Sequence, residues 1–185
     1  MTQLPALTAQ LAAYRRQRPT EADACDHFEA LLAHTDAFVR GRLSGHFTAS
    51  AWLVSADGTR TLLMHHAKLL RWLQPGGHAD GDIDLARVAL REAEEETGLT
   101  GLVVEDAAIF DLDRHWIPER GEVPGHWHHD VRYVVRALGG EDFVGNHESL
   151  GLAWRPVAEV AEDPDASLNR MACKWLAMNT HPAAG

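Results

Sequence analysis

Apolar side chains recur with helical spacing near the start of the chain. Residues 4–17 and 21–39 carry them every three or four positions, which predicts two helices. Pro19 separates the two segments, because a proline ring blocks the continuation of a preceding helix. Thr20 followed by Asp23 resembles a capping box with Asp in the place of Glu, so the second helix is expected to begin there.

Beyond these helices, the pattern changes to short apolar and alternating runs that are typical of strands. Asp57-Gly58 is a strong hairpin signal between the first two runs. Helical spacing returns at 84–97 and again at 166–179, whereas 111–128 is rich in Pro, Gly, His and Trp and is predicted to be a long connection. The predicted strands are 47–54, 61–66, 102–112, 129–138 and 152–157.

This order of elements predicts an α/β fold in which a mixed sheet has helices on both faces. Two units of organisation are expected within a single domain. Residues 1–45 form an N-terminal helical extension packed on the same domain, and residues 46–185 hold the sheet and the C-terminal helix. The extension also offers a surface through which a homodimer would form.

Composition narrows the classes of function. The 185 residues are 45% hydrophobic and 24% charged, the balance of one ordinary globular domain. A net charge of −10, from 17 Lys and Arg against 27 Asp and Glu, excludes a non-specific binder of nucleic-acid polymers or anionic membranes. No apolar run reaches membrane-spanning length and no signal peptide is recognisable, so a cytoplasmic protein is expected. Cys25 and Cys173 are expected to be reduced thiols.

A run of glutamates in the predicted helix 84–97 is the main candidate for chemistry. Glu92, Glu95 and Glu96 fall within an arc of roughly 100° on one helix face. Carboxylates at such spacing repel one another by about 0.2–0.5 kcal/mol per pair, and a divalent cation such as Mg²⁺ or Mn²⁺ reverses that sign. A solvated acidic helix face is the alternative interpretation.

The residues around these glutamates predict where the helix begins and ends, and they predict a flexible backbone segment before it. Asp82 or Asp84 is suited to cap the start of the helix, and Gly98 is the expected left-handed stop. Before the helix, Gly76 and Gly77 allow a tight turn and a close approach of the backbone to a ligand.

Taken together, this segment resembles the Nudix box, Gly-x5-Glu-x7-Arg-Glu-aliphatic-x-Glu-Glu-x-Gly-aliphatic, at eight positions across 23 residues. The matching residues are Gly77, Arg91-Glu92-Ala93, Glu95-Glu96 and Gly98-Leu99. The preceding run Trp72-Leu73-Gln74-Pro75-Gly76-Gly77 is similar to the lead-in of that family. The resemblance implies a Nudix-type α/β/α sandwich.

The resemblance also implies metal-dependent hydrolysis of a diphosphate bond in a nucleoside diphosphate linked to another moiety, a small-molecule substrate. Glu92, Glu95 and Glu96 correspond to the principal metal ligands, with the Gly77 carbonyl as a further ligand, and Arg91 orients the glutamates by ion pairing. The general base is left open between Glu95, Glu148 and a loop residue.

One position departs from the family pattern. Ile83 stands where the box has its first Glu, so one metal position is expected to be weaker unless Asp82 or Asp84 substitutes. Two other functions are known for this fold by resemblance, and the sequence favours neither. A non-catalytic nucleotide-sensing module should have lost box glutamates, which this chain keeps. An isoprenoid-diphosphate-type isomerase, by resemblance, needs a cysteine in the core before the box, and neither cysteine lies there.

A second group of polar residues alternates with apolar ones directly after the predicted long connection. If His126, His128, Asp130 and Arg132 enter a strand, their side chains share one face. Such a face is costly to bury unpaired, so it is expected to line a substrate cleft or an exposed sheet edge. A zinc site is a third interpretation, although no third histidine falls at suitable spacing. Glu148 lies where family members often carry an acidic residue near the site.

Overall fold

The computed structural model describes residues 4–145 and 149–179. Its helices are α1 (Leu4–Gln17), the short 3-10 helix η1 (Pro19–Glu21), α2 (Ala22–Leu32), α3 (Leu85–Thr97), α4 (Val157–Val160) and α5 (Ala166–Asn179). Its strands are β1 (His46–Val54), β2 (Arg60–His66), β3 (Arg71–Leu73), β4 (Gly76–His78), β5 (Leu102–Val104), β6 (Asp111–Ile117), β7 (His126–Ala137) and β8 (Ser149–Pro156). No helix among these residues has both the length and the apolar character needed to cross a membrane.

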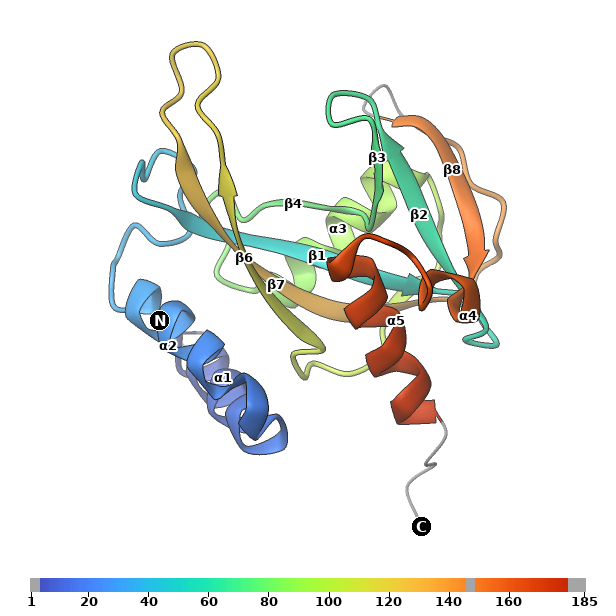
Figure 1. The fold of residues 1–185 in the computed structure, drawn as a ribbon, viewed down its shortest axis with the longest axis horizontal. Coiled ribbons are helices and arrows are strands. Elements are labelled where there is room, and N and C mark those ends of the chain that lie inside the picture. Colours follow the sequence, from blue (N-terminus) through green and yellow to red (C-terminus); the bar gives the residue numbers. More distant parts are fainter. Residues whose placement is uncertain (1–3, 146–148, 180–185) are drawn as a thin grey trace.

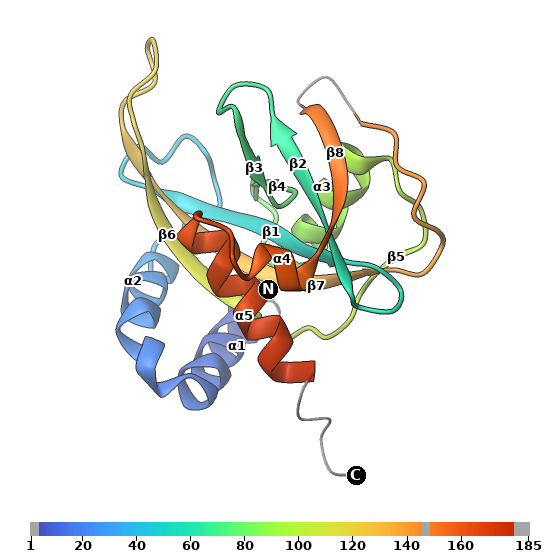
Figure 2. The ribbon, with the colours of Figure 1, turned by 45° about the vertical axis from the view of Figure 1, so that its right-hand side comes forward.

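The strands of the described residues form one mixed sheet around β1, whose nine residues are all buried. β1 pairs with β7 in parallel, from His46 opposite His128 to Val54 opposite Arg136, and it pairs with β2 and β4 in antiparallel fashion. β3 and β8 extend the sheet beside β2, whereas β5 and β6 pair with β7. Figures 1 and 2 show β2, β3 and β8 on one side and the long β6–β7 hairpin on the other.

Helices cover the two faces of this sheet, because successive strand residues point to opposite sides. Ala51 and Leu53 of β1 pack with residues of α3, whereas Trp52 and Val54 pack with α4 and α5. In Figure 1, α5 lies in front of β1 and β7, and α3 lies behind them. The α/β class and the expected sandwich of helices around a mixed sheet are therefore confirmed.

The N-terminal helices share a hydrophobic core with the sheet. Leu11 of α1 and Phe28 of α2 belong to the same buried cluster as Phe47 of β1, Val88 of α3 and Val131 of β7. Polar contacts join the same parts: the Tyr133 hydroxyl donates to the Gln10 carbonyl oxygen at 3.1 Å, and Gln10 donates to the backbone oxygen of Ala107.

The prediction of one helix over 21–39 was correct at its start to within one residue and wrong at its end. Thr20 lies inside η1, and no side chain caps the first turn of η1 or α2, so the proposed capping box does not form. α2 ends at Leu32, after which consecutive turns carry the chain to β1. Phe38 is buried from one of these turns, so its apolar character continued the helical pattern without a helix.

The predicted strand 102–112 and the predicted connection 111–128 were each correct only in part. β5 covers only Leu102–Val104, and a turn at Asp106 separates it from β6. Residues 111–117 form β6, which pairs along its whole length with β7, and β7 itself begins at His126. The connection is therefore limited to residues 118–125, where the prolines and glycines lie. Asp111, Asp113 and His115 occupy alternate positions of β6, opposite polar residues of β7.

Candidate active site and polar layer

The box helix α3 is fixed at both ends as its sequence predicts. The Asp84 side chain accepts a hydrogen bond from the backbone N–H of Arg87 at 3.1 Å, and Gly98 adopts a left-handed conformation with φ of 67°. Leu85, Ala89 and Ala93 are buried against the sheet. The glutamate-bearing side of α3 therefore has a defined orientation relative to β4.

Glu92 lies directly against Gly77 of β4. A Cβ added at Gly77 would clash with the Glu92 carboxylate, and one added at Gly76 would clash with the side chain of Ser50. Neither glycine has a positive φ. The expected tight turn is therefore absent. Glycine is required at position 76, where a side chain would also meet the backbone oxygen of Ala49, whereas a side chain at position 77 would displace the flexible Glu92 carboxylate.

Glu96 and Glu95 differ in their surroundings. Glu96 is buried, and its carboxylate accepts a hydrogen bond from the backbone N–H of Gly76 at 3.0 Å. The Glu95 side chain is 63% exposed and lies 3.9 Å from Nε of Arg91. The three carboxylates thus range from enclosed to solvent-facing along one side of α3.

Arg91 contacts both the helix and the strand. Its Nη2 donates to Oε1 of Glu92 at 2.9 Å and to the backbone oxygen of His78 at 3.3 Å. Burial raises the pKa of Glu92 above its ordinary value, and the hydrogen bond from Arg91 opposes that rise without cancelling it. A further positive charge beside Glu92 would favour its ionised form.

Position 83 is part of the hydrophobic core. Ile83 packs against the cluster that includes α2, and it lines a shallow hollow with Leu32 and Phe38. The nearby carboxylates are engaged elsewhere: Asp82 accepts from Arg87 Nε at 2.9 Å and from Nη2 at 2.7 Å, and Asp84 caps α3. The geometry gives no support to a substitution of either Asp for the missing Glu.

The alternating stripe of β7 belongs to a larger polar layer. His128, Asp130 and Arg132 face alternate residues of both neighbouring strands, because the three strands run in register. The partners on β1 are His46, Thr48 and Ser50, and those on β6 are His115, Asp113 and Asp111. The prediction that the stripe shares one face is borne out by contacts between its members: Asp130 accepts from Arg132 at 2.8 Å, and Nε2 of His126 lies 3.2 Å from that of His128.

At one end of this layer, Arg132 is enclosed by acidic groups. Its side chain is 3% exposed, and it lies 2.8 Å from Asp130, 3.0 Å from Asp111 and 3.3 Å from Asp113. Asp130 also accepts from Thr48 and Ser50. Such pairing inside the stripe favours a structural role for Asp130 and Arg132 over direct contact with substrate.

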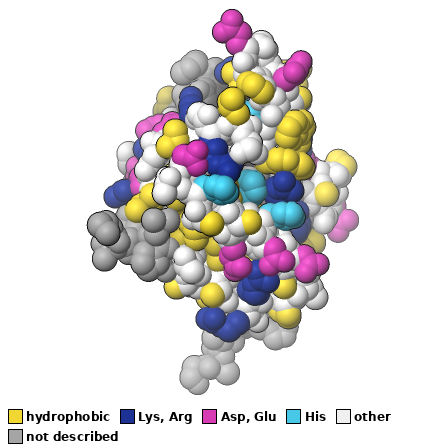
Figure 3. All heavy atoms as spheres, turned by 90° about the vertical axis from the view of Figure 1, so that its left-hand side faces the viewer, with side chains coloured by type: hydrophobic (Ala, Val, Ile, Leu, Met, Phe, Trp, Pro, Cys, Tyr) yellow, Lys and Arg dark blue, Asp and Glu magenta, His cyan; other side chains and the backbone are white. Residues whose placement is uncertain are grey.

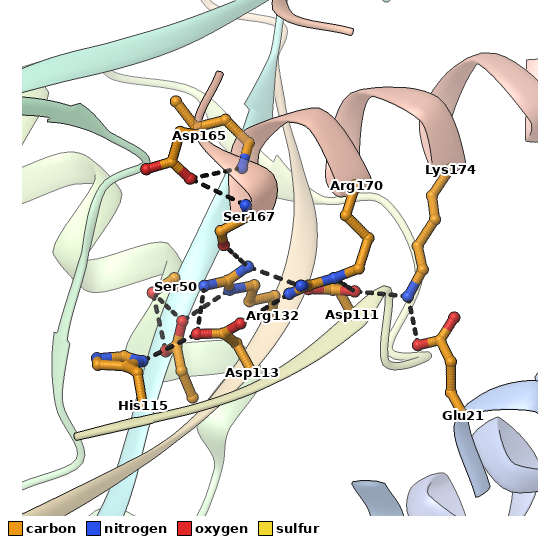
Figure 4. A network of polar contacts seen from close by, with 12 residues as sticks. Glu21, Ser50, Asp111, Asp113, His115, Arg132, Asp165, Ser167, Arg170 and Lys174 are labelled. Carbon is orange, nitrogen blue, oxygen red and sulfur yellow. Dashed lines mark hydrogen bonds and ion pairs between the residues drawn. The ribbon is translucent and has the colours of Figure 1, made fainter. Parts of the chain in front are cut away.

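Helix α5 closes this end of the layer (Figure 4). Ser167 accepts from Arg132 at 2.7 Å, and Arg170 donates to Asp111 and Asp113 at 2.8 Å. Lys174 lies 2.5 Å from Asp111 and 2.7 Å from Glu21, so one buried cation joins α5, β6 and the N-terminal helices.

The other end of the layer holds a group of histidines. Nitrogen atoms of His46, His78 and His128 all lie within 4.8 Å of one another. Burial, followed by neighbouring positive charges, lowers the pKa of His78 to about 4 and that of His128 to about 2. Figure 3 shows histidine side chains gathered on one face of the molecule beside Lys and Arg side chains.

Sequence reasoning missed His46 and His78. They lie about 80 and 50 residues before His128, so linear spacing could not join them to it. The sequence does contain a pattern that indicates a second polar strand: His46, Thr48 and Ser50 alternate with apolar residues, as the stripe on β7 does.

Glu148 lies outside the described residues, so its place relative to α3 stays a prediction. Trp116 of β6 is 50% exposed, and its ring packs against that of Trp127 with centroids 5.3 Å apart.

Comparisons with known proteins agree with this geometry. The model of the NUDIX domain matches residues 45–176. A Mycobacterium tuberculosis protein named "Putative 8-oxo-dGTP diphosphatase 3" is 32% identical over 153 residues, which are 75% of this chain and 64% of that protein. "Putative mutator protein MutT4" of the same organism is 34% identical over 91 residues, 49% of this chain and 35% of that protein. The chain thus spans between about one third and two thirds of the curated relatives it matches.

Among solved structures, an Ap4A hydrolase binary complex of C. elegans matches with a TM-score of 0.56 and 18% identity, over 74% of this chain and 98% of that one. At this identity, the likeness concerns the fold alone. The domain match covers most of the chain and includes the whole box from Gly77 to Leu99. On this evidence, the chain belongs to the Nudix family.

Proposed function

We propose that this chain is a pyrophosphohydrolase that cleaves a diphosphate bond in a nucleoside diphosphate linked to another moiety, with Mg²⁺ or Mn²⁺ as cofactor. The observation that carries the proposal is the fixed position of two glutamates of α3 against the backbone of β4. Glu92 occupies the space beside Gly77, and Glu96 is bonded to the N–H of Gly76. Family membership then favours hydrolysis over the sensing and isomerase alternatives.

The donor set fits a divalent cation of this kind. Mg²⁺ and Mn²⁺ prefer oxygen ligands, and Glu92, Glu95, Glu96 and the Gly77 carbonyl would supply them. The raised pKa of Glu92 fits the same interpretation, because an adjacent cation stabilises a buried carboxylate. When bound, such an ion neutralises phosphate charge and activates water as a nucleophile.

We assign different roles in the proposed reaction to the side chains around the box. Arg91 positions Glu92 through their 2.9 Å contact and ties α3 to the His78 carbonyl. Glu95 is the most exposed of the three box carboxylates, which supports it as the group that meets substrate or water. Glu148 is the alternative base. His126 and His128 remain candidates for substrate contact, whereas we assign Asp130 and Arg132 to positioning the strands.

The substrate is a small nucleotide in this proposal, not a nucleic-acid polymer. The names of similar proteins suggest the first two substrates to test. These are 8-oxo-dGTP, from the name of the M. tuberculosis protein, and Ap4A, from the name of the C. elegans structure. ADP-ribose, a nucleotide sugar and a CDP-alcohol complete a panel that covers the leaving groups the sequence leaves open.

The test is hydrolysis of this panel with Mg²⁺ or Mn²⁺, with products identified by mass, for the wild type and Glu96→Gln. Glutamine keeps an oxygen that accepts from the Gly76 N–H but removes the charge, so kcat should fall by about 100-fold or more while the fold persists. Glu94→Gln is the matched control, because Glu94 is exposed on another side of α3. Near-full turnover of Glu96→Gln at saturating Mg²⁺ would refute the metal assignment.

A further inference from the structure

The histidine end of the polar layer is separate from the box glutamates. Gly77 lies opposite Ala49 in the β1–β4 pairing and contacts Glu92 of α3. His78 is the next residue of β4 and lies opposite Thr48, so its side chain points to the other face of the sheet. Two different sets of donors, carboxylates on one face and imidazoles on the other, therefore flank β4.

His46 provides an unsatisfied ligand atom. Its side chain is 1% exposed, and its Nδ1 lies 3.3 Å from the backbone oxygen of Arg42. Because a carbonyl only accepts, Nδ1 carries the proton and Nε2 carries the lone pair. That Nε2 is buried without a hydrogen-bond partner, which costs free energy that a bound ligand would recover.

The neighbouring rings are arranged around this atom. Ring centroids of His78 and His128 lie 5.2 and 4.9 Å from that of His46, and 5.0 Å from each other. His126 donates its Nδ1 proton to the Pro124 carbonyl at 2.9 Å, so its Nε2 accepts from His128. Metal-binding histidines are usually held through their second nitrogen by a backbone carbonyl or a similar group. His46 is held in this way by the Arg42 carbonyl, and His128 is held by His126.

We propose that His46, His78 and His128 form a three-histidine site for a Zn²⁺-type transition-metal ion, oriented by His126. Imidazole nitrogens suit Zn²⁺ and are poor ligands for Mg²⁺. Zinc ligands at about 2.1 Å in tetrahedral geometry lie about 3.4 Å apart. The present limit of 4.8 Å therefore requires the ligand atoms to approach one another by up to about 1.4 Å, with water as the fourth ligand.

The positive charge of Arg40, which contacts His78, would repel a cation bound at this site. Its Nη2 lies 3.0 Å from His78 Nδ1, and its Nε pairs with Asp80 at 2.9 Å. The Arg40 side chain is 60% exposed, so it is free to leave the ring when the ion binds. Zinc binding should therefore compete with the Arg40 contact, and Arg40→Ala should bind Zn²⁺ more tightly than the wild type.

The experiment is titration of chelator-treated protein with Zn²⁺ by calorimetry, and with Co²⁺ by visible absorption, in a Cys173→Ser background. With Mg²⁺ in excess to compete for the box carboxylates, one equivalent should bind at the histidine group, with the intense bands of four-coordinate Co²⁺. His46→Ala and His78→Ala should each weaken Zn²⁺ binding by at least about 10-fold. His34→Ala, in an exposed turn, is the matched control and should bind as the wild type does.

Glu96→Gln separates this site from the proposed catalytic one. It should retain wild-type Zn²⁺ affinity whatever its hydrolytic activity. His78 is only partly buried, so His78→Ala keeps the test decisive if His46→Ala fails to fold. The proposal is overturned if no stoichiometric Zn²⁺ binding is found, or if binding persists at wild-type affinity in His78→Ala.

Discussion

The aliphatic side chain of Ile83 lies where the Nudix box meets the N-terminal helices. It packs against the cluster that contains Phe28 and Leu31 of α2 and Leu85 of α3. An ionised carboxylate at this position would lose hydration without gaining a cation, since Asp82 and Asp84 already hold the adjacent donors. An aliphatic residue at position 83 therefore suits the contact with α2 in this chain.

Ile83→Glu is expected to destabilise the protein by about 1–3 kcal/mol, because it places a charge against an apolar surface. Urea unfolding of both proteins measures this difference. Ile83→Val is the control and should cost only about 0.5–1.5 kcal/mol. Unchanged stability of Ile83→Glu, together with a lower Mg²⁺ requirement, would show instead that position 83 serves the metal.

The sequence predicted correctly those features of the box that depend only on neighbouring residues. Asp84 and Gly98 act at the ends of α3 as their chemistry requires, since capping depends only on nearby backbone groups. Gly76 and Gly77 were expected to allow a tight turn and a close approach of the backbone to a ligand. In the structure they lie in strand β4, and their neighbours are protein side chains. This arrangement is tertiary, because Ser50 and Glu92 come from distant parts of the chain.

At the scale of elements, β1, β6 and β7 form one unit with α5. Their polar residues stand opposite one another in three adjacent strands, and α5 supplies Arg170 and Lys174 to balance Asp111. Hydrophobic periodicity did not predict β6, because a strand that faces a polar layer lacks the apolar side chains that mark a strand. The α5 helix was predicted with its observed ends, since its apolar face packs on Trp52 and Val134.

Asp113 should make this unit sensitive to acid. Burial alone would raise its pKa, but the hydrogen bond with His115 and the charges of Arg132 and Arg170 hold the pKa well below its ordinary value of 3.8. A carboxyl with a lowered folded-state pKa stabilises the protein above about pH 3.8 and loses that contribution as the pH falls further.

Asp113→Asn should therefore lower the urea midpoint at pH 6, and the difference from the wild type should shrink as the pH is lowered towards 3. Glu119→Gln, in the exposed tip of the β6–β7 hairpin, is the control and should show no such trend. An equal difference at pH 6 and pH 3 would contradict the lowered pKa.

At the scale of the whole molecule, residues 1–45 are expected to fold with the rest of the chain and not as a separate unit. Leu7, Leu11 and Phe28 share one core with Phe47 and Tyr133. Lys174 of α5 also lies 2.7 Å from both Glu21 and the Tyr14 hydroxyl, so removal of the helices would leave buried polar groups without partners. The group of His46, His78 and His128 also depends on the folding of the whole chain, because its members come from three different strands of the sheet.

The chain offers separate probes for its two parts. All six tryptophans lie after residue 45, so their fluorescence reports on the sheet and the C-terminal helices. Cys25 lies in α2 and is fully buried, and burial raises the pKa of its thiol, so it should react with a thiol reagent only after α2 detaches. Cys173 is exposed and must be replaced by Ser.

In Cys173→Ser, the urea midpoint for Cys25 labelling by a short thiol-reagent pulse should coincide with the midpoint of the tryptophan fluorescence change. A shared core makes the two parts unfold in one cooperative transition. Lys174→Met should lower both midpoints together, because it removes the cation that joins Glu21 to Asp111. Labelling of Cys25 at clearly lower urea than the fluorescence change would mean that the N-terminal helices open independently and that the single-unit interpretation is wrong.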